Sequence, residues 1–191
     1  MTKPTIAVFL APGCEEIEAL TVVDILFRAG IECHTISVGE DRLVTSSHEV
    51  SVLANRHIDD ADLDLDAYDM LVLPGGIPGT PNLHANDKLM DAVRAFAAAN
   101  RPVSAICAAP SILAEEGLLR GRRATSNPGF HEVLAQHGAE VAPNEPVVVD
   151  GNFTTSQGMG TAIDFGLEIV RRYKGDDEVE RLKGAVVYWR R

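Results

Sequence analysis

The feature of this sequence that most limits its fold is a regular alternation of short, apolar, β-branched runs with longer amphipathic patterns. The predicted strands are Thr5–Leu10, Glu32–Val38, Met70–Leu73, Val103–Ile106, Val147–Val149 and Phe153–Thr155, with a small hairpin or edge pair at Leu43–Thr45 and Val50–Leu53. The predicted helices are Glu15–Ala29, Asp87–Ala99, Gly129–His137, Gly160–Lys174 and Asp176–Gly184. This order predicts right-handed βαβ units, and therefore an α/β fold with a doubly wound, mostly parallel sheet between two layers of helices.

Length and composition narrow the classes of protein further. The chain has 191 residues, which suits a single domain over residues 1–191. Its formal net charge of −11 would repel phosphate backbones, so nucleic acid is not an expected partner. The three cysteines, Cys14, Cys33 and Cys107, have no CxxC spacing, and the six histidines form no HxH or HExxH pattern. We therefore expect neither a disulfide framework nor a metal site.

The first residues allow two interpretations. The apolar run Ile6–Ala11 precedes Cys14, as in a lipoprotein signal, but it is short and Lys3 is the only basic residue before it. A buried first strand fits this composition better. No apolar run approaches the roughly 18–20 residues of a membrane span, so we expect no membrane contact and a cytoplasmic location.

Cys107 lies where a predicted strand passes directly into a helix, within Ala105-Ile106-Cys107-Ala108-Ala109-Pro110. Small neighbours permit a sharp turn that lifts the side chain above the sheet, as in a nucleophile elbow. A thiol at a helix N-terminus feels positive dipole and free N–H groups, from which we expect a lowered pKa. The alternative is a buried cysteine that merely ends a core strand.

Two further features fall at the edge of the sheet where parallel strands end and ligands gather. Glu18 shares an apolar helical stripe with Val22, Ile25 and Ala29, so its carboxyl group must find a partner or stay protonated. The alternative is an ordinary acidic residue at a helix start. The paired glycines of Leu73-Pro74-Gly75-Gly76 can direct backbone N–H groups at a ligand, although the same letters serve any tight turn.

Four segments in order resemble the ThiJ/PfpI family, in the branch that contains a parkinsonism-associated protein deglycase and its bacterial chaperone-like relatives. The segments are Ala11-Pro12-Gly13-Cys14-Glu15-Glu16-Ile17-Glu18, Val72-Leu73-Pro74-Gly75-Gly76, Ala105-Ile106-Cys107-Ala108-Ala109-Pro110 and Thr155-Ser156-Gln157-Gly158-Met159-Gly160-Thr161. The resemblance runs from Ile6 to about Val170. It implies a flavodoxin-like fold of the class I glutamine amidotransferase type, a homodimer, and no metal or organic cofactor.

The resemblance also implies roles for particular residues. Cys107 matches the family's reactive cysteine, and Glu18 matches the protonated carboxyl group that hydrogen-bonds its sulfur. Gly75, Gly76 and Ala108 match the backbone donors around the sulfur.

The sequence departs from the family pattern at several positions. Asn127 stands where many relatives have a histidine near the cysteine, and His131, one helical turn on, is a candidate replacement. Asparagine cannot accept a proton, which weakens a peptidase or amidase mechanism. His48 stands where a relative has an arginine, and Met159 stands where the family usually has a proline. Cys14 could form a disulfide with Cys107 under oxidation, although a passive small residue is the simpler interpretation in a cytosolic chain.

The function we predict is cysteine-dependent, cofactor-free conversion of reactive dicarbonyls, of the glutathione-independent glyoxalase or protein deglycase type, with a role in carbonyl or oxidative stress. Its substrates would be small dicarbonyls or glycated molecules. Cys107 would attack the aldehyde, Glu18 would move protons, and Gly75, Gly76 and Ala108 would hold the oxyanion. The competing hypothesis is a redox-sensing, chaperone-like protein whose Cys107 oxidises to sulfinate, without physiological turnover.

Overall fold

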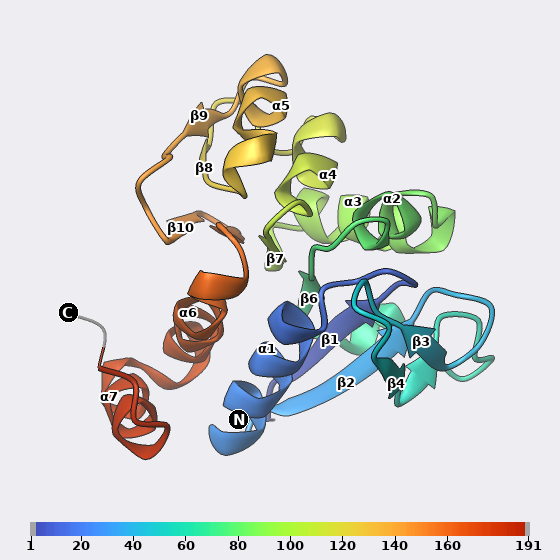
Figure 1. The fold of residues 1–191 in the computed structure, drawn as a ribbon, viewed down its shortest axis with the longest axis horizontal. Helices are drawn as coiled ribbons and strands as arrows, with labels where there is room; N and C mark the ends of the chain where they lie inside the picture. Colours follow the sequence, from blue (N-terminus) through green and yellow to red (C-terminus); the bar gives the residue numbers. More distant parts are fainter. Residues whose placement is uncertain (1–2, 190–191) are drawn as a thin grey trace.

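The computed structural model describes residues 3–189, which fold around a seven-stranded sheet (Figure 1). The strands of this sheet are β1 (Thr5–Leu10), β2 (Glu32–Ser37), β5 (Arg56–His57), β6 (Met70–Leu73), β7 (Val103–Ile106), β10 (Val147–Asp150) and β11 (Phe153–Ser156). Their order is β10-β11-β7-β6-β1-β2-β5, and every neighbouring pair is parallel except β10 with β11. The predicted mostly parallel, doubly wound sheet is confirmed.

Two small sheets and seven α-helices complete the described fold. The small sheets pair β3 (Leu43–Thr45) with β4 (Ser51–Leu53), which confirms the predicted hairpin, and β8 (Arg123–Ala124) with β9 (Glu140–Val141). The α-helices are α1 (Glu16–Arg28), α2 (Gly79–His84), α3 (Asp87–Ala98), α4 (Pro110–Glu115), α5 (His131–Gln136), α6 (Ala162–Lys174) and α7 (Asp176–Ala185). Short 3₁₀ turns lie at η1 (Leu65–Ala67), η2 (Pro128–Phe130) and η3 (Met159–Thr161).

The sheet separates two hydrophobic cores because successive side chains of a strand point to opposite faces. In β1, Ala7 and Phe9 enter the core beneath α2, α3, α4 and α5, whereas Ile6, Val8 and Leu10 enter the core beneath α1, α6 and α7. Figure 1 shows the first group of helices above the sheet and the second group below it. The central strands are buried on both faces, which explains their continuous apolar runs.

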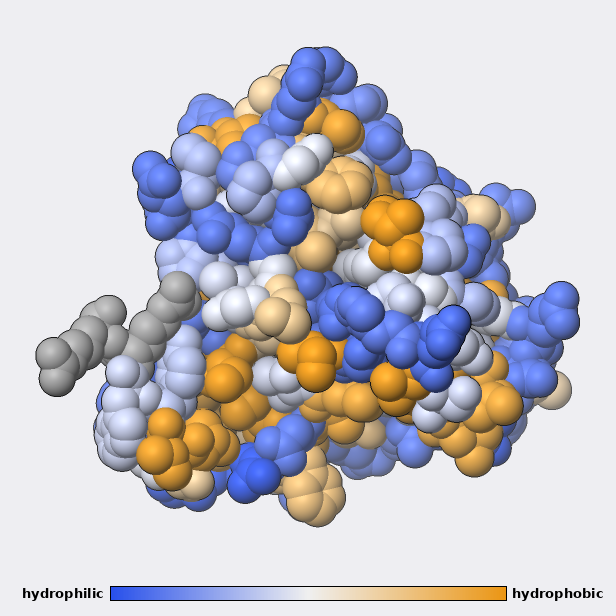
Figure 2. All heavy atoms as spheres, in the orientation of Figure 1, coloured by the Kyte–Doolittle hydropathy of each residue, from blue (hydrophilic) through white to orange (hydrophobic). Residues whose placement is uncertain are grey.

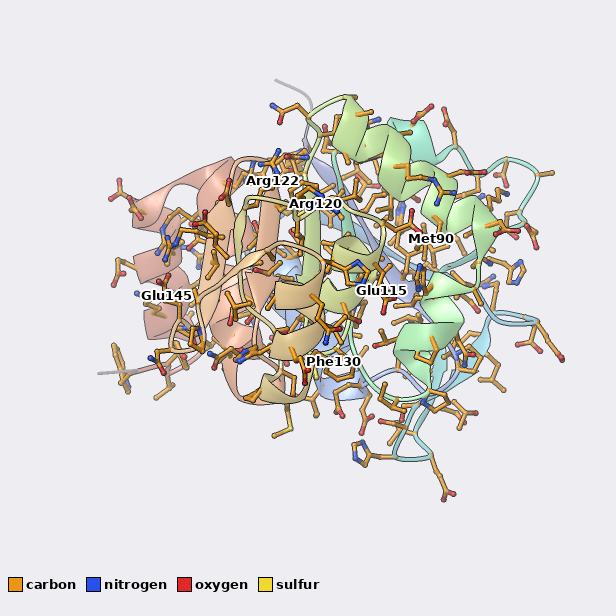
Figure 3. The ribbon with its side chains drawn as sticks, turned by 90° about the horizontal axis from the view of Figure 1, so that it is seen from above. Met90, Glu115, Arg120, Arg122, Phe130 and Glu145 are labelled. Atoms are coloured by element: carbon orange, nitrogen blue, oxygen red, sulfur yellow. The ribbon has the colours of Figure 1, made fainter. Side chains whose placement is uncertain are left out.

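The structure differs from the sequence prediction where proline and glycine shape the local chain. The predicted helix Gly129–His137 begins as the 3₁₀ turn η2 at Pro128 and becomes α-helical only at His131. Helix α2 was missed because its sequence, Gly-Thr-Pro-Asn-Leu-His, has low helix propensity and no period to detect. Figure 3 looks down on the layer of α4 and α5, with Glu115 at the end of α4 and Phe130 at the end of η2.

None of the helices within residues 3–189 combines the length and the apolar character that crossing a membrane requires.

Close packing of α1 on α6 depends on a glycine in α6, and this contact predicts the effect of a substitution. A Cβ atom on Gly166 would lie 3.2 Å from Cβ of Ile25, tighter than ordinary van der Waals contact. We expect Gly166→Val to push the helices apart and lower the free energy of unfolding by about 1–3 kcal/mol in urea titrations. Gly184→Val in α7 is the matched control, because a Cβ there meets no atom within 4 Å, and it should cost less than about 0.5 kcal/mol. Equal losses in the two variants would contradict the packing argument.

Candidate active site

The candidate site lies at the carboxyl edge of four parallel strands. Helix α1, which carries Glu18, follows β1, while Gly75 follows β6, Cys107 follows β7 and Gly158 follows β11. The parallel register therefore brings together residues that are up to 140 positions apart in the chain. Ligand sites of open parallel sheets form at this edge.

The backbone at Cys107 has the sharp corner that the sequence predicted. Its φ of 66° is in the left-handed region, which a non-glycine residue enters at a cost of about 1–2 kcal/mol. The corner is fixed from both sides, since Cys107 N–H donates to the Ser156 carbonyl at 2.9 Å and Cys107 C=O accepts from Asn127 N–H at 2.8 Å. The cysteine is half-buried.

Glu18 is a buried carboxyl group on the inner face of α1. Its side chain is 1% exposed, and the predicted apolar stripe with Val22 and Ile25 is confirmed. Oε2 accepts from the Gly75 N–H at 2.9 Å. Oε1 is buried and has no partner of good hydrogen-bond geometry among the described residues, although the Cys107 thiol and the Met159 amide are close enough to influence the carboxyl group.

The turn after β6 requires glycine at positions 75 and 76, because neighbouring atoms lie where a Cβ atom would be. A Cβ on Gly75 would lie 2.6 Å from Cβ of Cys107 and 2.8 Å from Oε2 of Glu18. A Cβ on Gly76, whose φ is 95°, would lie 2.3 Å from the Glu15 nitrogen. Without side chains, this turn places backbone N–H groups directly against the two functional side chains.

The predicted backbone donors divide into two groups. The N–H groups of Gly76 and Ala108 interact with the Cys107 sulfur and lower its pKa. The N–H of Gly75 donates to the buried Glu18 carboxyl group in this structure, and its predicted role as a donor to an oxyanion stays a prediction.

Burial sets the ionisation of the pair. It raises the pKa of Glu18 to about 7, against the lowering influence of Cys107 and the Gly75 N–H. Burial, and next the Glu18 charge, raise the pKa of Cys107 to about 12. The predicted lowering of the Cys107 pKa was therefore wrong, since two N–H groups do not outweigh desolvation and a neighbouring carboxylate. Glu18 is the group that ionises near neutral pH, which suits a proton acceptor.

The two candidate accessory residues beyond β7 have different surroundings. Oδ1 of Asn127 accepts from Gly129 N–H at 3.0 Å and begins η2, while its Nδ2 lies on the side of Gly158. Nε2 of His131 is 3.0 Å from the Ser126 carbonyl oxygen. That oxygen can only accept, so Nε2 donates to the backbone, and this contact turns the ring to the backbone rather than to the thiol.

The other two cysteines are free and buried or half-buried. The backbone of Cys14 packs against the turn, because a Cβ on Gly76 would lie 2.6 Å from the Cys14 carbonyl carbon. Burial and the Glu16 charge raise the pKa of Cys14 to about 11, and burial raises that of Cys33 in β2 to about 12. Both thiols are thus poor nucleophiles at neutral pH.

Gly158 is a part of the site that the sequence analysis did not single out. It is buried, and a Cβ there would lie 3.6 Å from Oε1 of Glu18 and 3.7 Å from Sγ of Cys107. A signal was present in the sequence, because Gly158 follows a predicted strand at the same edge of the sheet as Gly75 and Cys107.

Among the described residues, one cluster of side chains could ligate a metal ion, and it consists of Glu15, Glu16 and His48. Their carboxylate and imidazole ligand atoms lie within 4.8 Å of one another. His48 Nδ1 is 3.2 Å from Glu16 and 3.6 Å from Glu15, and the Glu16 contact raises the pKa of His48. An exposed ion pair accounts for this arrangement, which joins the β3–β4 hairpin to the start of α1.

Comparison with known proteins identifies similar chains across nearly the whole sequence. Residues 4–172 match the DJ-1/PfpI family. The chain is 33% identical to the glutathione-independent glyoxalase DJ-1 of Schizosaccharomyces pombe, covering 91% of this chain and 93% of that protein. It is 35% identical to DJ-1 homolog B of Arabidopsis thaliana, with 96% of this chain covered, but it spans only 41% of that protein's length. The crystal structure of Drosophila melanogaster DJ-1beta superposes with a TM-score of 0.92 at 32% identity, covering 99% of this chain and 100% of that one.

The raised pKa of Glu18 predicts a pH dependence of stability. Between an unfolded pKa near 4.5 and a folded pKa of about 7, the folded protein binds more protons than the unfolded chain, so stability falls as pH rises through this window. The fall should be about 3 kcal/mol, and Glu18→Gln should remove it. Urea unfolding at pH 4.5, 5.5, 6.5 and 7.5 measures how the free energy of unfolding changes with pH in the unmodified protein and in Glu18→Gln. Parallel pH profiles for the two proteins would show that Glu18 does not titrate in this range.

Proposed function

Because the chain belongs to the DJ-1/PfpI family, we propose that it converts small 2-oxoaldehydes such as methylglyoxal into 2-hydroxy acids without glutathione or a cofactor. The observation that carries this proposal is the pairing of a half-buried thiol with a buried carboxyl group. Sγ of Cys107 and Oε1 of Glu18 lie 3.7 Å and 3.6 Å from the position that a Cβ on Gly158 would take, so the two atoms are neighbours. A nucleophile and a proton acceptor placed side by side can act on one bound substrate.

In the first step, Sγ of Cys107 attacks the aldehyde carbon, and the thiol proton passes to the Glu18 carboxylate. A C–S bond forms, and the electron pair of the C=O π bond moves to oxygen. The N–H groups of Gly76 and Ala108, which already face the sulfur, hold that developing negative charge. Glu18 returns its proton to this oxygen, which leaves a neutral hemithioacetal and an ionised carboxyl group.

In the second step, Glu18 takes the proton from the former aldehyde carbon and returns it to the adjacent carbon, while the hydroxyl proton of the hemithioacetal passes to the oxygen of that adjacent carbon. The first carbon is thereby oxidised to a thioester and the second is reduced to an alcohol, so no external oxidant or reductant is needed. Water hydrolyses the thioester, which releases lactate from methylglyoxal and restores the Cys107 thiol. The pKa of about 7 lets Glu18 both accept and donate a proton in this sequence.

The similarity to a protein named glutathione-independent glyoxalase supports this reaction over other uses of a thiol. A glycated amine presents the same adjacent oxygen-bearing carbons, so deglycation would follow the same steps with the amine as an additional leaving group. The three free thiols are in keeping with a reducing compartment, and we place the reaction in the cytoplasm.

A redox-sensing, chaperone-like role is the second candidate, and it rests on the same two side chains. Cys107 is half-buried, and a protonated Glu18 could donate a hydrogen bond to a sulfinate oxygen. The raised pKa of Cys107 disfavours the thiolate, which is the form that attacks peroxide, and we therefore rank this function second.

The partner we propose is a second copy of the chain, bound through α1. Ile17, Leu20 and Phe27 expose large apolar side chains on this helix, and Phe27 is 80% exposed. Figure 2 shows apolar side chains gathered over α1 and the neighbouring β3–β4 hairpin, where Leu43, Val50 and Leu53 are exposed. An apolar face of this kind is typical of a protein interface.

For the reaction, we expect Cys107→Ala to abolish conversion of methylglyoxal to lactate in the absence of glutathione. We expect Glu18→Gln to lower the rate by about 10²–10⁴-fold, because it removes general acid–base catalysis. Lactate appearance followed by an enzyme-coupled assay measures both. Cys33→Ala is the control, since Cys33 lies in β2, and it should retain the rate of the unmodified protein.

Two results would overturn the proposed reaction. The first is an unchanged rate in Cys107→Ala. The second is absence of dicarbonyl turnover together with a gain of two oxygen atoms confined to Cys107 after mild peroxide, measured by mass spectrometry, which would establish the redox-sensing role instead.

For the partner, we expect size-exclusion chromatography with light scattering to give twice the monomer mass. Leu20→Glu should shift the protein to the monomer, because it places a charge in the apolar face of α1. Val149→Glu on the edge strand β10 is the control, since Val149 is exposed to a similar degree but lies outside that face. A monomeric unmodified protein, or dissociation by both variants, would contradict this interface.

A further inference from the structure

Three chemically different groups meet beside Gly158. A carbon atom at the Cβ position of this glycine would have as its three nearest heavy atoms Oε1 of Glu18 at 3.6 Å, Sγ of Cys107 at 3.7 Å and Nδ2 of Asn127 at 3.8 Å. That point is one bond length from the Gly158 Cα, so it is not itself a position for a bound molecule. The three distances show instead that the carboxyl oxygen, the sulfur and the amide nitrogen lie close to one another around this glycine.

The orientation of the Asn127 amide is determined by its other contacts. Gly129 N–H can only donate, and it lies 3.0 Å from one side-chain atom of Asn127, which is therefore the oxygen. The nitrogen, Nδ2, is the atom left on the side of Gly158 and Cys107.

The segment that carries this amide is held in place on the reactive corner. Asn127 N–H donates to the Cys107 carbonyl at 2.8 Å, and His131 donates to the carbonyl of Ser126, the residue before Asn127. The donor is thus fixed relative to the thiol from which it is separated by 20 positions in the chain.

A buried carboxyl oxygen lies close to the Asn127 amide. Glu18 is 99% buried, and its Oε1 lacks a partner of good geometry among the described residues. Buried polar atoms without such a partner are rare and call for an explanation. Oε1 and Nδ2 are an acceptor and a donor near the same sulfur atom.

We propose that Nδ2 of Asn127 donates a hydrogen bond to the second carbonyl oxygen of the substrate and thereby selects 1,2-dicarbonyls over simple aldehydes. The inference rests on the proposed function and adds to it the residue that recognises the second oxygen. The aldehyde oxygen lies with the N–H groups of Gly76 and Ala108, and the adjacent carbonyl oxygen lies with Asn127.

This contact acts on the transition state as well as on binding. When Glu18 removes the proton from the former aldehyde carbon, the electron pair of the C–H bond forms a C=C bond and negative charge moves to the second oxygen. A fixed donor at that oxygen stabilises the charge as it develops. Asn127 is neutral and cannot take up a proton, so its contribution is hydrogen bonding alone.

The test compares two substitutions at Asn127 and two aldehydes of similar size. Asn127→Ala removes both the donor and the oxygen that accepts from Gly129. Asn127→Asp keeps an oxygen for Gly129 and, at pH 8, replaces the donor by a negatively charged acceptor. Methylglyoxal has the second carbonyl oxygen, and propanal lacks it. Binding is measured as protection of Cys107 from methyl methanethiolsulfonate, followed by mass spectrometry, so the measurement does not depend on turnover.

In both variants, we expect methylglyoxal to protect Cys107 about 10- to 100-fold less well than in the unmodified protein. We expect kcat for lactate formation to fall by a similar factor. Protection by propanal should stay within about twofold of the unmodified protein, because propanal never uses the donor. Equal weakening with both aldehydes would place Asn127 at the attacked oxygen and overturn the proposal. If protection by methylglyoxal weakened in Asn127→Ala but not in Asn127→Asp, the hydrogen bond from Gly129 N–H to the side-chain oxygen would be the important contact, and the proposal would be overturned.

The same measurements separate this inference from the proposed function. If methylglyoxal protects Cys107 in the unmodified protein but no lactate forms, the proposed reaction fails and Asn127 is still judged by the protection ratios. If protection by methylglyoxal weakened in Asn127→Asp but not in Asn127→Ala, the cause would be the effect of the new charge on Glu18, and the proposal would be overturned. If methylglyoxal does not protect Cys107 in the unmodified protein, the proposed reaction and the proposed role of Asn127 are both wrong.

Discussion

The hydrogen bond from Gly75 N–H to the Glu18 carboxyl group is the interaction on which the rest of the site depends. It joins the first turn of α1 to the end of β6, and it holds a carboxyl group in a place where water cannot solvate it. Gly75 can serve only because it has no side chain, since a Cβ would collide with both Glu18 and Cys107. One contact therefore fixes the acid, the turn and the distance between the acid and the thiol.

The same contact explains why the thiol is not strongly acidic in the resting protein. With Gly75 N–H engaged by Glu18, the sulfur keeps the N–H groups of Gly76 and Ala108, which do not compensate for burial beside a carboxylate. Burial raises the pKa of both groups, and the Glu18 charge raises that of the thiol further, so the two titrate as a coupled pair. The Glu18 carboxylate is an acceptor at hand for the thiol proton.

How much the sequence could predict depended on whether a property was local. Thr5–Leu10 was predicted to the residue, and Glu18 was recognised as unusual because a 3.6-residue period places it among Val22 and Ile25. The partner of the Gly75 N–H and the direction of the Cys107 pKa shift could not be predicted, because both follow from burial and from a carboxyl group 57 or 89 positions earlier in the chain. No local pattern carries that information, and a short helix such as α2 has too few residues to show a period.

Asn127 illustrates how tertiary placement gives a residue its chemistry. The sequence showed that it cannot act as a base, which favoured a reaction without a third titrating group. The structure adds that the amide is oriented by Gly129 and anchored through Cys107, so its nitrogen is a fixed neutral donor. A neutral donor stabilises developing charge without competing for the proton that Cys107 and Glu18 exchange. A histidine there could accept that proton and divert it from the substrate carbon. The asparagine thereby keeps proton transfer within the thiol–carboxyl pair.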